Sequence, residues 1–511
     1  MSRIRANTIA LTLSFFATAF FFFLQLKILT NFLDQTAVGV WTAVTALGMI
    51  LSPLSQLGMP QVLVRYGAKF DAEDRLHRLR PLHGLAVRIF FGGLVAVSAI
   101  LIVAGPALAS VLGEGEFDRR LLVLGFVAVG TGSIRAVNNA SLRGLRRMTV
   151  MAALEIAFSV LVTLAYFLFR HRLTVELTLV LFGVASSAVA IAGHLYLVRL
   201  FRRIPGPETP EKGSVFREVR GFWSGAAMGG IFLVAMEQLD RPILAAGLVT
   251  LQQLAVFQVA ARLALFPRRL SYVPFQVMYP EITHKWEGPR RGELRGDMEL
   301  FTKLVLALGI GVSAVLCVFA KPFILLVATP EYLSGAWILW MFMAVFPLVT
   351  LHQPLILFLR ATGRVWFAFA GEAGWLAAYL GLGTLLLGRF GLPGFVGGQL
   401  AGSSLVLAYA LVLFHRLELP RPALRFYLTR ILIAGLVWGL SVLLGAHLPL
   451  LIWWQLALLA LAAGAVGNFV LVRSGFLTRE EEDRAIALLA GRGTIGRVAG
   501  FFFAWPRRGH A

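Results

Sequence analysis

Long apolar runs, separated by short polar loops, make up most of the chain as far as about residue 472. Many of these runs have the length of roughly 20 residues that an α-helix needs to cross the hydrocarbon core of a bilayer. They lack the alternation of apolar and polar residues that marks the strands of a membrane β-barrel. Hydropathy predicts about fourteen transmembrane helices. They are expected near residues 7–29, 36–58, 85–111, 121–142, 149–169, 176–199, 219–246, 251–279, 301–327, 333–358, 365–388, 392–415, 426–447 and 450–472.

The composition supports an all-α polytopic membrane protein. Hydrophobic residues make up 58% of the chain and charged residues only 14%, which is far from the balance of a soluble domain. The single cysteine, Cys317, excludes an intramolecular disulfide and a cysteine-based metal site. The nine histidines are scattered, so the sequence predicts neither a metal site nor a cofactor.

The net charge of +21 is spread over many loops instead of one domain, which argues against nucleic acid as a partner and favours anionic membrane lipids. Loops on alternate sides of the predicted spans differ strongly in Lys and Arg, and "RYGAKFDAEDRLHRLR" and "HKWEGPRRGELR" lie on the basic side. By the positive-inside rule, both termini are expected in the cytoplasm of a bacterium, with the spans in its inner membrane.

An internal repeat is visible in the charged residues. Sliding the chain against itself by about 217 positions aligns "LRGLRRMTVMAALE" with "LRATGRVWFAFAGE". The matched pairs include Arg143 with Arg360, Arg147 with Arg364, Glu155 with Glu372, Arg172 with Arg389, Ser186 with Ser403, and Arg199 with Arg416. Because charges are rare inside apolar sequence, chance explains this agreement poorly.

The repeat predicts two six-helix lobes in the same orientation around a central cavity, followed by two further helices. The expected boundaries are 1–205 for the first lobe, 206–420 for the second, 421–475 for the additional helices and 476–511 for a basic cytoplasmic tail.

Three stretches carry a resemblance to a known family: "QLGMPQVLVRYGA", the segment that begins "EQLDRPILAAGLVTLQQLAVFQVAARLALFPRRL", and the segment that begins "FLRATGRVWFAFAGEAGWLAAYLGLG". In these stretches the chain resembles the multidrug/oligosaccharidyl-lipid/polysaccharide exporter superfamily, in its polysaccharide transport branch. The resemblance implies an alternating-access flippase. Its cargo would be an undecaprenyl-pyrophosphate-linked oligosaccharide (an O-antigen, capsule or exopolysaccharide unit), moved from the cytoplasmic to the periplasmic leaflet through a basic central cavity.

Basic side chains dominate the predicted membrane interior. An ionised side chain at the bilayer centre costs about 2.5–3.5 kcal/mol on insertion scales, so each is expected to face a cavity, a partner or a headgroup. Arginine donates in bidentate fashion to phosphate oxygens. We therefore predict a substrate-binding set, with structural pairing or contact with lipid headgroups as the alternative for several members. The set is Gln25, Lys27, Arg135, Arg241, Arg262 and Arg268.

The stretch "MEQLDRP" places acidic and basic residues within one turn of predicted span seven. Glu237 and Arg241 are four residues apart and are expected to pair on one helical face. Asp240 has three interpretations: a gating or ion-coupling residue, assigned together with Glu237, one half of a static ion pair, or a direct contact with sugar. Pro242 is expected to bend the helix.

Several other functions are alternatives to a flippase for a lipid-linked oligosaccharide. A lipid II flippase of peptidoglycan synthesis is a close alternative, and a cation-coupled drug exporter is a further one. A membrane-embedded glycan-processing enzyme would need catalytic groups on a large loop, and no such loop or motif stands out, so the chain is predicted not to be an enzyme. A structural partner in an envelope assembly would tolerate neutralised intramembrane charges. H⁺ or Na⁺ as a coupling ion and polysaccharide assembly proteins as partners stay open.

Overall fold

The computed structural model describes residues 2–73, 75–112, 115–204, 214–287, 291–420 and 423–447, and every regular element in these ranges is helical. The chain divides into two compact units, residues 1–258 and 259–511. Ten helices of the described part are long and apolar enough to cross a membrane. Each predicted span up to residue 447 coincides with helix. The span predicted at 450–472 lies outside the described residues, so the total of fourteen stays a prediction.

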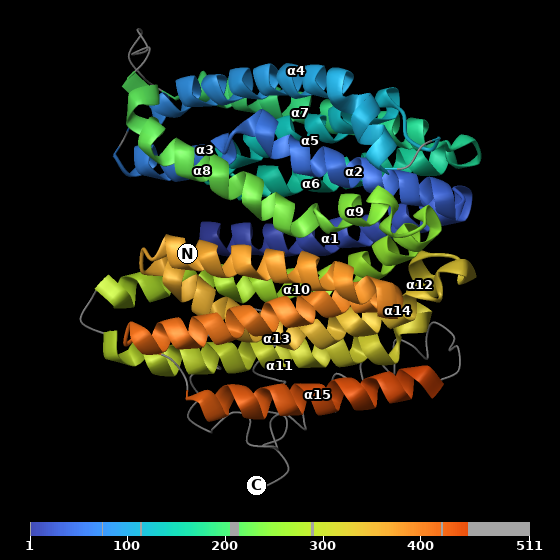
Figure 1. Cartoon of the computed structure of the whole chain (residues 1–511). Coiled ribbons are helices and arrows are strands. Elements are labelled where there is room, and N and C mark those ends of the chain that lie inside the picture. The colour runs from blue at the N-terminus through green and yellow to red at the C-terminus, as the bar shows by residue number, and fades with distance from the viewer. Residues whose placement is uncertain are drawn as a thin grey trace. The chain divides into compact units, whose positions relative to one another are not determined.

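Unit 1 is a bundle built around α5, which contacts α2, α3, α4, α6 and α7. Figure 1 shows these helices running along one another, with α4 on the outer side of the bundle. The helices of this unit are α1 (Ser2–Phe32), α2 (Gln35–Gln56), α3 (Met59–Ala72), α4 (Leu79–Leu112), α5 (Arg119–Gly144), α6 (Met148–Leu168), α7 (Val175–Phe201), α8 (Ser214–Gln238), α9 (Asp240–Ile243) and the first turns of α10 (Leu251–Glu287).

Unit 2 contains the rest of α10 and is organised around α13, which contacts α11, α12, α14 and α15. Its further helices are α11 (Leu294–Val318), α12 (Ala320–Val327), α13 (Gly335–Ala361), α14 (Val365–Arg416) and α15 (Leu424–His447). The long α14 is broken at Gly391, whose φ of 63° is a left-handed conformation that favours glycine. The break falls between the predicted spans 365–388 and 392–415, so α14 holds both of them.

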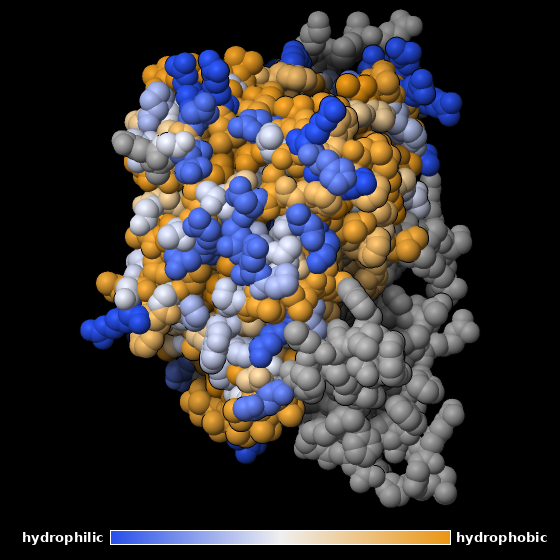
Figure 2. Space-filling model, turned by 90° about the vertical axis from the view of Figure 1, so that its right-hand side faces the viewer, coloured by the Kyte–Doolittle hydropathy of each residue, from blue (hydrophilic) through white to orange (hydrophobic). Residues whose placement is uncertain are grey.

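The outer surface is apolar over large areas, as expected where helices face lipid. Val103 is 83% exposed and Trp366 is 82% exposed. Figure 2 shows apolar side chains reaching the surface over much of the face that it displays. Polar side chains instead connect helices inside unit 1, where Nδ2 of Asn138 donates to the carbonyl of Ala190 at 2.8 Å. Such bonds hold helices together where the surrounding lipid provides no hydrophobic driving force.

Local sequence explains how α3 meets α5. Asp34 and Asp118 cap α2 and α5 by accepting backbone N–H bonds at 2.7 and 2.6 Å. At the other end of α2, Gly58 adopts a φ of 72° and turns the chain into α3. Gly67 of α3 then passes so close to α5 that an added Cβ would lie 2.6 Å from the Cα of Gly144. These turns place α3 across the second half of α5.

The beginning of α8 is tied to the rest of unit 1 by a cluster of charges on Glu218. Its carboxylate accepts from Lys69 at 2.6 Å, from Arg78 at 2.9 Å and from Arg75 at 3.3 Å. Its backbone carbonyl also accepts from the hydroxyl of Tyr66 at 3.0 Å. The hydrogen bond from Lys69, followed by the nearby positive charges, lowers the pKa of Glu218 although partial burial opposes this shift.

Because the pKa of Glu218 is lowered by folding, the carboxylate contributes stability above its unfolded pKa of about 4.3, and this contribution is lost as the pH falls through the lower, folded pKa. We expect Glu218→Gln to reduce the free energy of unfolding by about 1 kcal/mol near neutral pH, the size typical of partly exposed ion pairs. Unfolding in detergent over a pH series from about 7 to 3 should show the difference vanishing at the acid end. The exposed Glu116, changed to Gln, is the control. A difference independent of pH would contradict the assignment.

Candidate functional site

A polar pocket lies inside unit 1 at the end predicted to be cytoplasmic. It has a volume of about 340 Å³ and is formed by the start of α3, the second half of α5 and the start of α6. Arg135, Asn139 and Arg143 follow one another at intervals of four residues, so they lie along one face of α5. The lining residues are Pro60, Gln61, Val64, Gly132, Arg135, Ala136, Asn139, Ala140, Arg143 and Glu155.

Arg135 is held in place by a ring and by a carboxylate. Its guanidinium carbon lies 3.4 Å from the centre of the Phe158 ring, and its Nε lies 3.6 Å from Oε1 of Glu155. The side chain of Arg135 is only 15% exposed. Since the ring and the carboxylate both stabilise a cation, Arg135 can stay charged inside the apolar bundle.

Only some of the polar groups of the pocket have a hydrogen-bond partner. Nδ2 of Asn139 donates to the same oxygen, Oε1 of Glu155, that faces Arg135. Nη1 of Arg135 and Oδ1 of Asn139 are buried, and neither has a hydrogen-bond partner among the described residues. A buried polar group without a partner is unfavourable by about 1–3 kcal/mol, so these two atoms mark a place where a ligand can bind.

Arg143 adds a second positive charge at the exposed edge of the pocket. Its Nε donates to the sulfur of Met151 at 3.2 Å. Two arginines and one glutamate leave the pocket with a net positive charge. Because guanidinium groups match phosphate oxygens in geometry and charge, the pocket suits a phosphate group.

The charged stretch at the end of α8 forms a second, fully matched cluster. Arg241 pairs with Asp240, Nη1 to Oδ1 at 2.9 Å, and the two side chains are 4% and 9% exposed. Nε of Arg241 donates to Gln258 at 2.7 Å, and Nη1 donates to the backbone carbonyl of Glu237 at 2.7 Å. Arg241 therefore contacts the carbonyl of Glu237 and not its exposed carboxylate, which differs from the expected pairing four residues apart.

The helix breaks where Pro242 was expected to bend it. α8 ends at Gln238, and α9 leads into a π-helical turn, Leu244–Leu248, in which Gly247 has a φ of 85°. Proline lacks the N–H that would continue the helical ladder, and this explains the interruption. The bend places Asp240 and Arg241 side by side inside the bundle, which supports the interpretation of a static pair.

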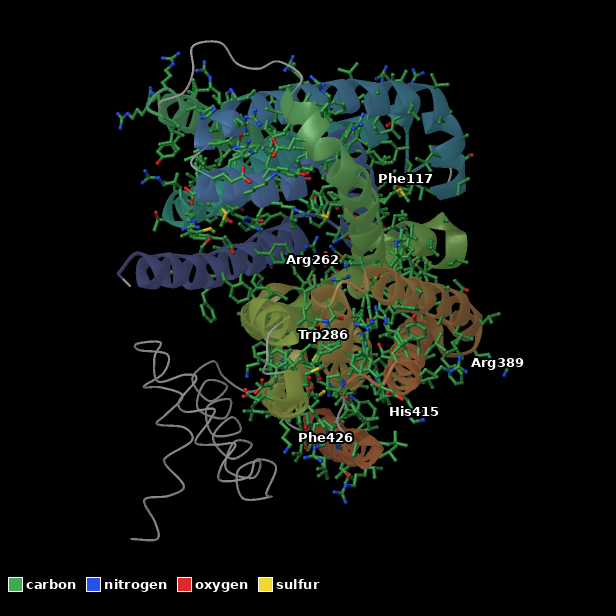
Figure 3. The ribbon with its side chains drawn as sticks, turned by 90° about the vertical axis from the view of Figure 1, so that its left-hand side faces the viewer. Phe117, Arg262, Trp286, Arg389, His415 and Phe426 are labelled. Atoms are coloured by element: carbon green, nitrogen blue, oxygen red, sulfur yellow. The ribbon has the colours of Figure 1, made fainter. Side chains whose placement is uncertain are left out.

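The remaining predicted residues lie in different surroundings. Gln25 uses its amide to join α1 to α6, donating to Thr163 at 3.0 Å and to the carbonyl of Ser159 at 3.1 Å. Lys27 is half-buried on α1, one turn from the end of that helix. Arg262 is half-buried on α10 in unit 2 and is labelled in Figure 3. Arg268 lies on the same helix, and its side chain is outside the described residues. Substrate contacts for these four stay predictions.

Comparison with known proteins establishes the family. A family model described as polysaccharide biosynthesis protein matches residues 4–286, more than half of the chain. The chain belongs to this family. No curated protein sequence matches it. The match covers the first two of the three sequence stretches and confirms the resemblance.

Solved structures show which fold this polysaccharide biosynthesis protein has. The lipid II flippase MurJ, in an inward closed conformation, is similar with a TM-score of 0.64 and 13% identity, over 92% of this chain and 99% of that one. An inward-facing multidrug resistance MATE transporter of the MOP superfamily has a TM-score of 0.61 and 14% identity, over 82% and 95%. The bent form of the Vibrio cholerae MATE transporter VcmN has a TM-score of 0.53 and 14% identity, over 84% of this chain and 99% of that one. These likenesses show an all-α fold like that of the MurJ and MATE structures, and the ten candidate spans of the described residues agree with a multi-pass membrane protein.

Sequence reasoning found Arg135 but missed its partners. The sequence related Glu155 to Glu372 through the repeat, but it did not indicate a contact of Glu155 with Arg135 or with Asn139. Asn138 joins α5 to α7, and Asn139 joins α5 to α6 through its bond to Glu155. Gln61 was not singled out. The usable signal was the spacing of Arg135, Asn139 and Arg143, which defines a polar stripe on an otherwise apolar helix.

The matched Asp240–Arg241 pair allows a test that separates structure from transport. Removing one member of a buried ion pair leaves the other charge unpaired and destabilises by about 3–5 kcal/mol. We therefore expect Arg241→Gln to lower the thermal stability of the purified protein, and Asp240→Asn in the same chain to restore most of it. Arg389→Gln, at an exposed arginine labelled in Figure 3, is the control. Unchanged stability of Arg241→Gln would show that the pair is not structural.

Proposed function

We propose that this protein is a flippase that carries a polyprenyl-pyrophosphate-linked oligosaccharide across the bacterial inner membrane by alternating access. The observation that carries the proposal is the positively charged pocket inside a membrane-embedded bundle, in a chain of the polysaccharide biosynthesis family. A lipid-linked glycan has an anionic pyrophosphate between an apolar tail and a polar sugar. Such a cargo needs a cationic contact that is shielded from the hydrocarbon.

The membrane potential supplies a direction for this transport. A negative charge that leaves a negative-inside cell gains about 2.3 kcal/mol per 100 mV if it crosses the whole field. We place the basic loops, both termini and the pocket at the cytoplasmic side, following the positive-inside rule. The anionic substrate would then enter from the leaflet in which it is synthesised.

A carrier explains these features better than an enzyme. Among the described residues, no group of three or more His, Cys, Asp or Glu side chains is placed to hold a metal ion. The polar groups of the pocket are arginine, asparagine, glutamine and one carboxylate already engaged by Arg135. This set binds an anion, and it lacks a nucleophile paired with a base.

Lipid II is a second candidate substrate, because the MurJ structure is similar over 92% of this chain. That structure is of a lipid II flippase, and lipid II is itself a lipid-linked glycan. Deleting the gene and identifying the lipid-linked glycan that accumulates in the cytoplasmic leaflet distinguishes the two. Accumulation of an oligosaccharide unit supports the proposal, and accumulation of a peptidoglycan precursor supports lipid II.

Neutralising Arg135 tests the role of the pocket in transport. We expect Arg135→Gln to leave membrane abundance normal, because it removes a charge that is unfavourable in the bilayer, but to reduce glycan export at least tenfold. Arg135→Lys should retain partial activity, because it keeps the charge and loses the bidentate geometry. Export and protein level are measured in the same complemented deletion strain. Wild-type export by Arg135→Gln at normal abundance would contradict the proposed site.

A further inference from the structure

The internal repeat allows the pocket to be compared with the equivalent place in unit 2. The offset of 217 positions found in the sequence also relates helix boundaries: α5 ends at Gly144 and α13 at Ala361, and α6 begins at Met148 and α14 at Val365. The two pairs of helices therefore occupy equivalent places in the two repeats. Differences between them show what is particular to the pocket.

In unit 2 the equivalent carboxylate and the equivalent serine hydroxyl each have a partner. Nη2 of Arg360 donates to Oε1 of Glu372. Nε1 of Trp375 donates to the hydroxyl of Ser403 at 3.1 Å. In unit 2 the carboxylate of Glu372 therefore pairs with Arg360, the arginine at the end of the preceding helix.

In unit 1 the same positions do not close on one another. Arg143, which corresponds to Arg360, bonds to a methionine sulfur instead of to Glu155. The hydroxyl of Ser186, which corresponds to Ser403, has no hydrogen-bond partner among the described residues, because Phe158 stands where unit 2 has an indole N–H. Unit 1 thus has the equivalent carboxylate, Glu155, but the equivalent arginine, Arg143, bonds to Met151 instead.

Two substitutions between the repeats explain the change. Arg135 and Asn139 stand where unit 2 has His352 and Ile356, and both face Glu155. Both side chains contact the carboxylate of Glu155. One donor, Nη1 of Arg135, and one acceptor, Oδ1 of Asn139, have no hydrogen-bond partner among the described residues. A phosphate oxygen accepts from the first, and a hydroxyl donates to the second. The volume of about 340 Å³ lies within the range of small-molecule sites.

We propose that the pocket binds a phosphate ester together with a neighbouring hydroxyl, and that the natural ligand is the phosphate nearest the glycan with the first sugar attached to it. Glu155 is the internal counter-ion that holds Arg135 when the pocket is empty and competes with the phosphate for it. The identity of the ligand rests on the proposed function. The recognition of phosphate and hydroxyl, and the competition by Glu155, rest on the geometry alone.

Binding of a soluble probe to the purified full-length protein tests the competition. Glucose 1-phosphate is titrated into the protein in phosphatidylcholine nanodiscs, and the dissociation constant is measured by calorimetry. We expect Glu155→Gln to tighten binding about tenfold, because the phosphate no longer competes with a carboxylate for Arg135. Glu372→Gln, at the equivalent position of unit 2, is the matched control and should not change the constant. Equal affinity in the wild type and Glu155→Gln, or no binding by either, would overturn the proposal.

The hydroxyl contact is tested by placing the residue of the second repeat in the first. Asn139→Ile should weaken binding of glucose 1-phosphate at least fivefold and leave binding of inorganic pyrophosphate unchanged, because pyrophosphate offers no sugar hydroxyl. If Asn139→Ile loses both ligands and melts at a lower temperature, Asn139→Gln is measured, because it keeps an uncharged amide with its donor and its acceptor. Retained binding of glucose 1-phosphate by Asn139→Gln supports the hydroxyl contact, and its loss overturns it. If Asn139→Ile binds glucose 1-phosphate as the wild type does, the hydroxyl contact is wrong.

The same chemistry also occurs in the headgroup of phosphatidylglycerol. The titration is therefore repeated in nanodiscs that contain about one fifth of this lipid. Undiminished binding of glucose 1-phosphate supports a glycan ligand, whereas its loss assigns the pocket to a membrane lipid and overturns the proposed ligand. The proposed function fails separately, if the deletion strain accumulates no lipid-linked glycan although the purified protein binds the probe.

Discussion

An ionised side chain inside a bilayer has to find its partners within the protein, and this requirement shapes unit 1. The bundle meets it in two ways. Arg241 is surrounded by Asp240, Gln258 and a backbone carbonyl, so its charge is fully matched. Arg135 has a ring beneath it and a carboxylate at 3.6 Å, but one of its nitrogens has no partner among the described residues. The first arrangement is matched within the protein, and in the second one donor of Arg135 is available for the ligand that we propose.

Arg241 and Arg135 have different kinds of partner because they lie at different places in their helices. Arg241 lies just beyond the end of α8, where the backbone carbonyl of Glu237 accepts from its Nη1. Arg135 lies in the regular part of α5, where the backbone carbonyls are already used in the helix, so its partners must come from α6. α3 crosses α5 closely at Gly67, and the start of α3 lines the pocket with Pro60, Gln61 and Val64.

Much of the fold was accessible from the sequence, because span length and hydropathy act locally. The predicted spans up to residue 447 coincide with helices, and the repeat offset read from a few charges also relates the ends of α5 and α13. The surroundings of single side chains were less accessible. Gln25 was predicted to contact substrate, and the structure shows its amide bonded to α6, which depends on how α1 packs. Arg135 was found because a charge in an apolar helix is conspicuous, whereas its pairing with Glu155 depends on the rotation of α6.

Direct transfer of a lipid-linked glycan between leaflets tests the central claim. The purified protein is reconstituted into liposomes that contain a labelled polyprenyl-pyrophosphate-linked oligosaccharide, and the accessibility of the glycan to an external enzyme is followed with time. The account predicts that the wild type transfers this lipid much faster than protein-free liposomes and that Arg135→Gln does not. Equal rates with and without the protein, or equal rates for the wild type and Arg135→Gln, would contradict it.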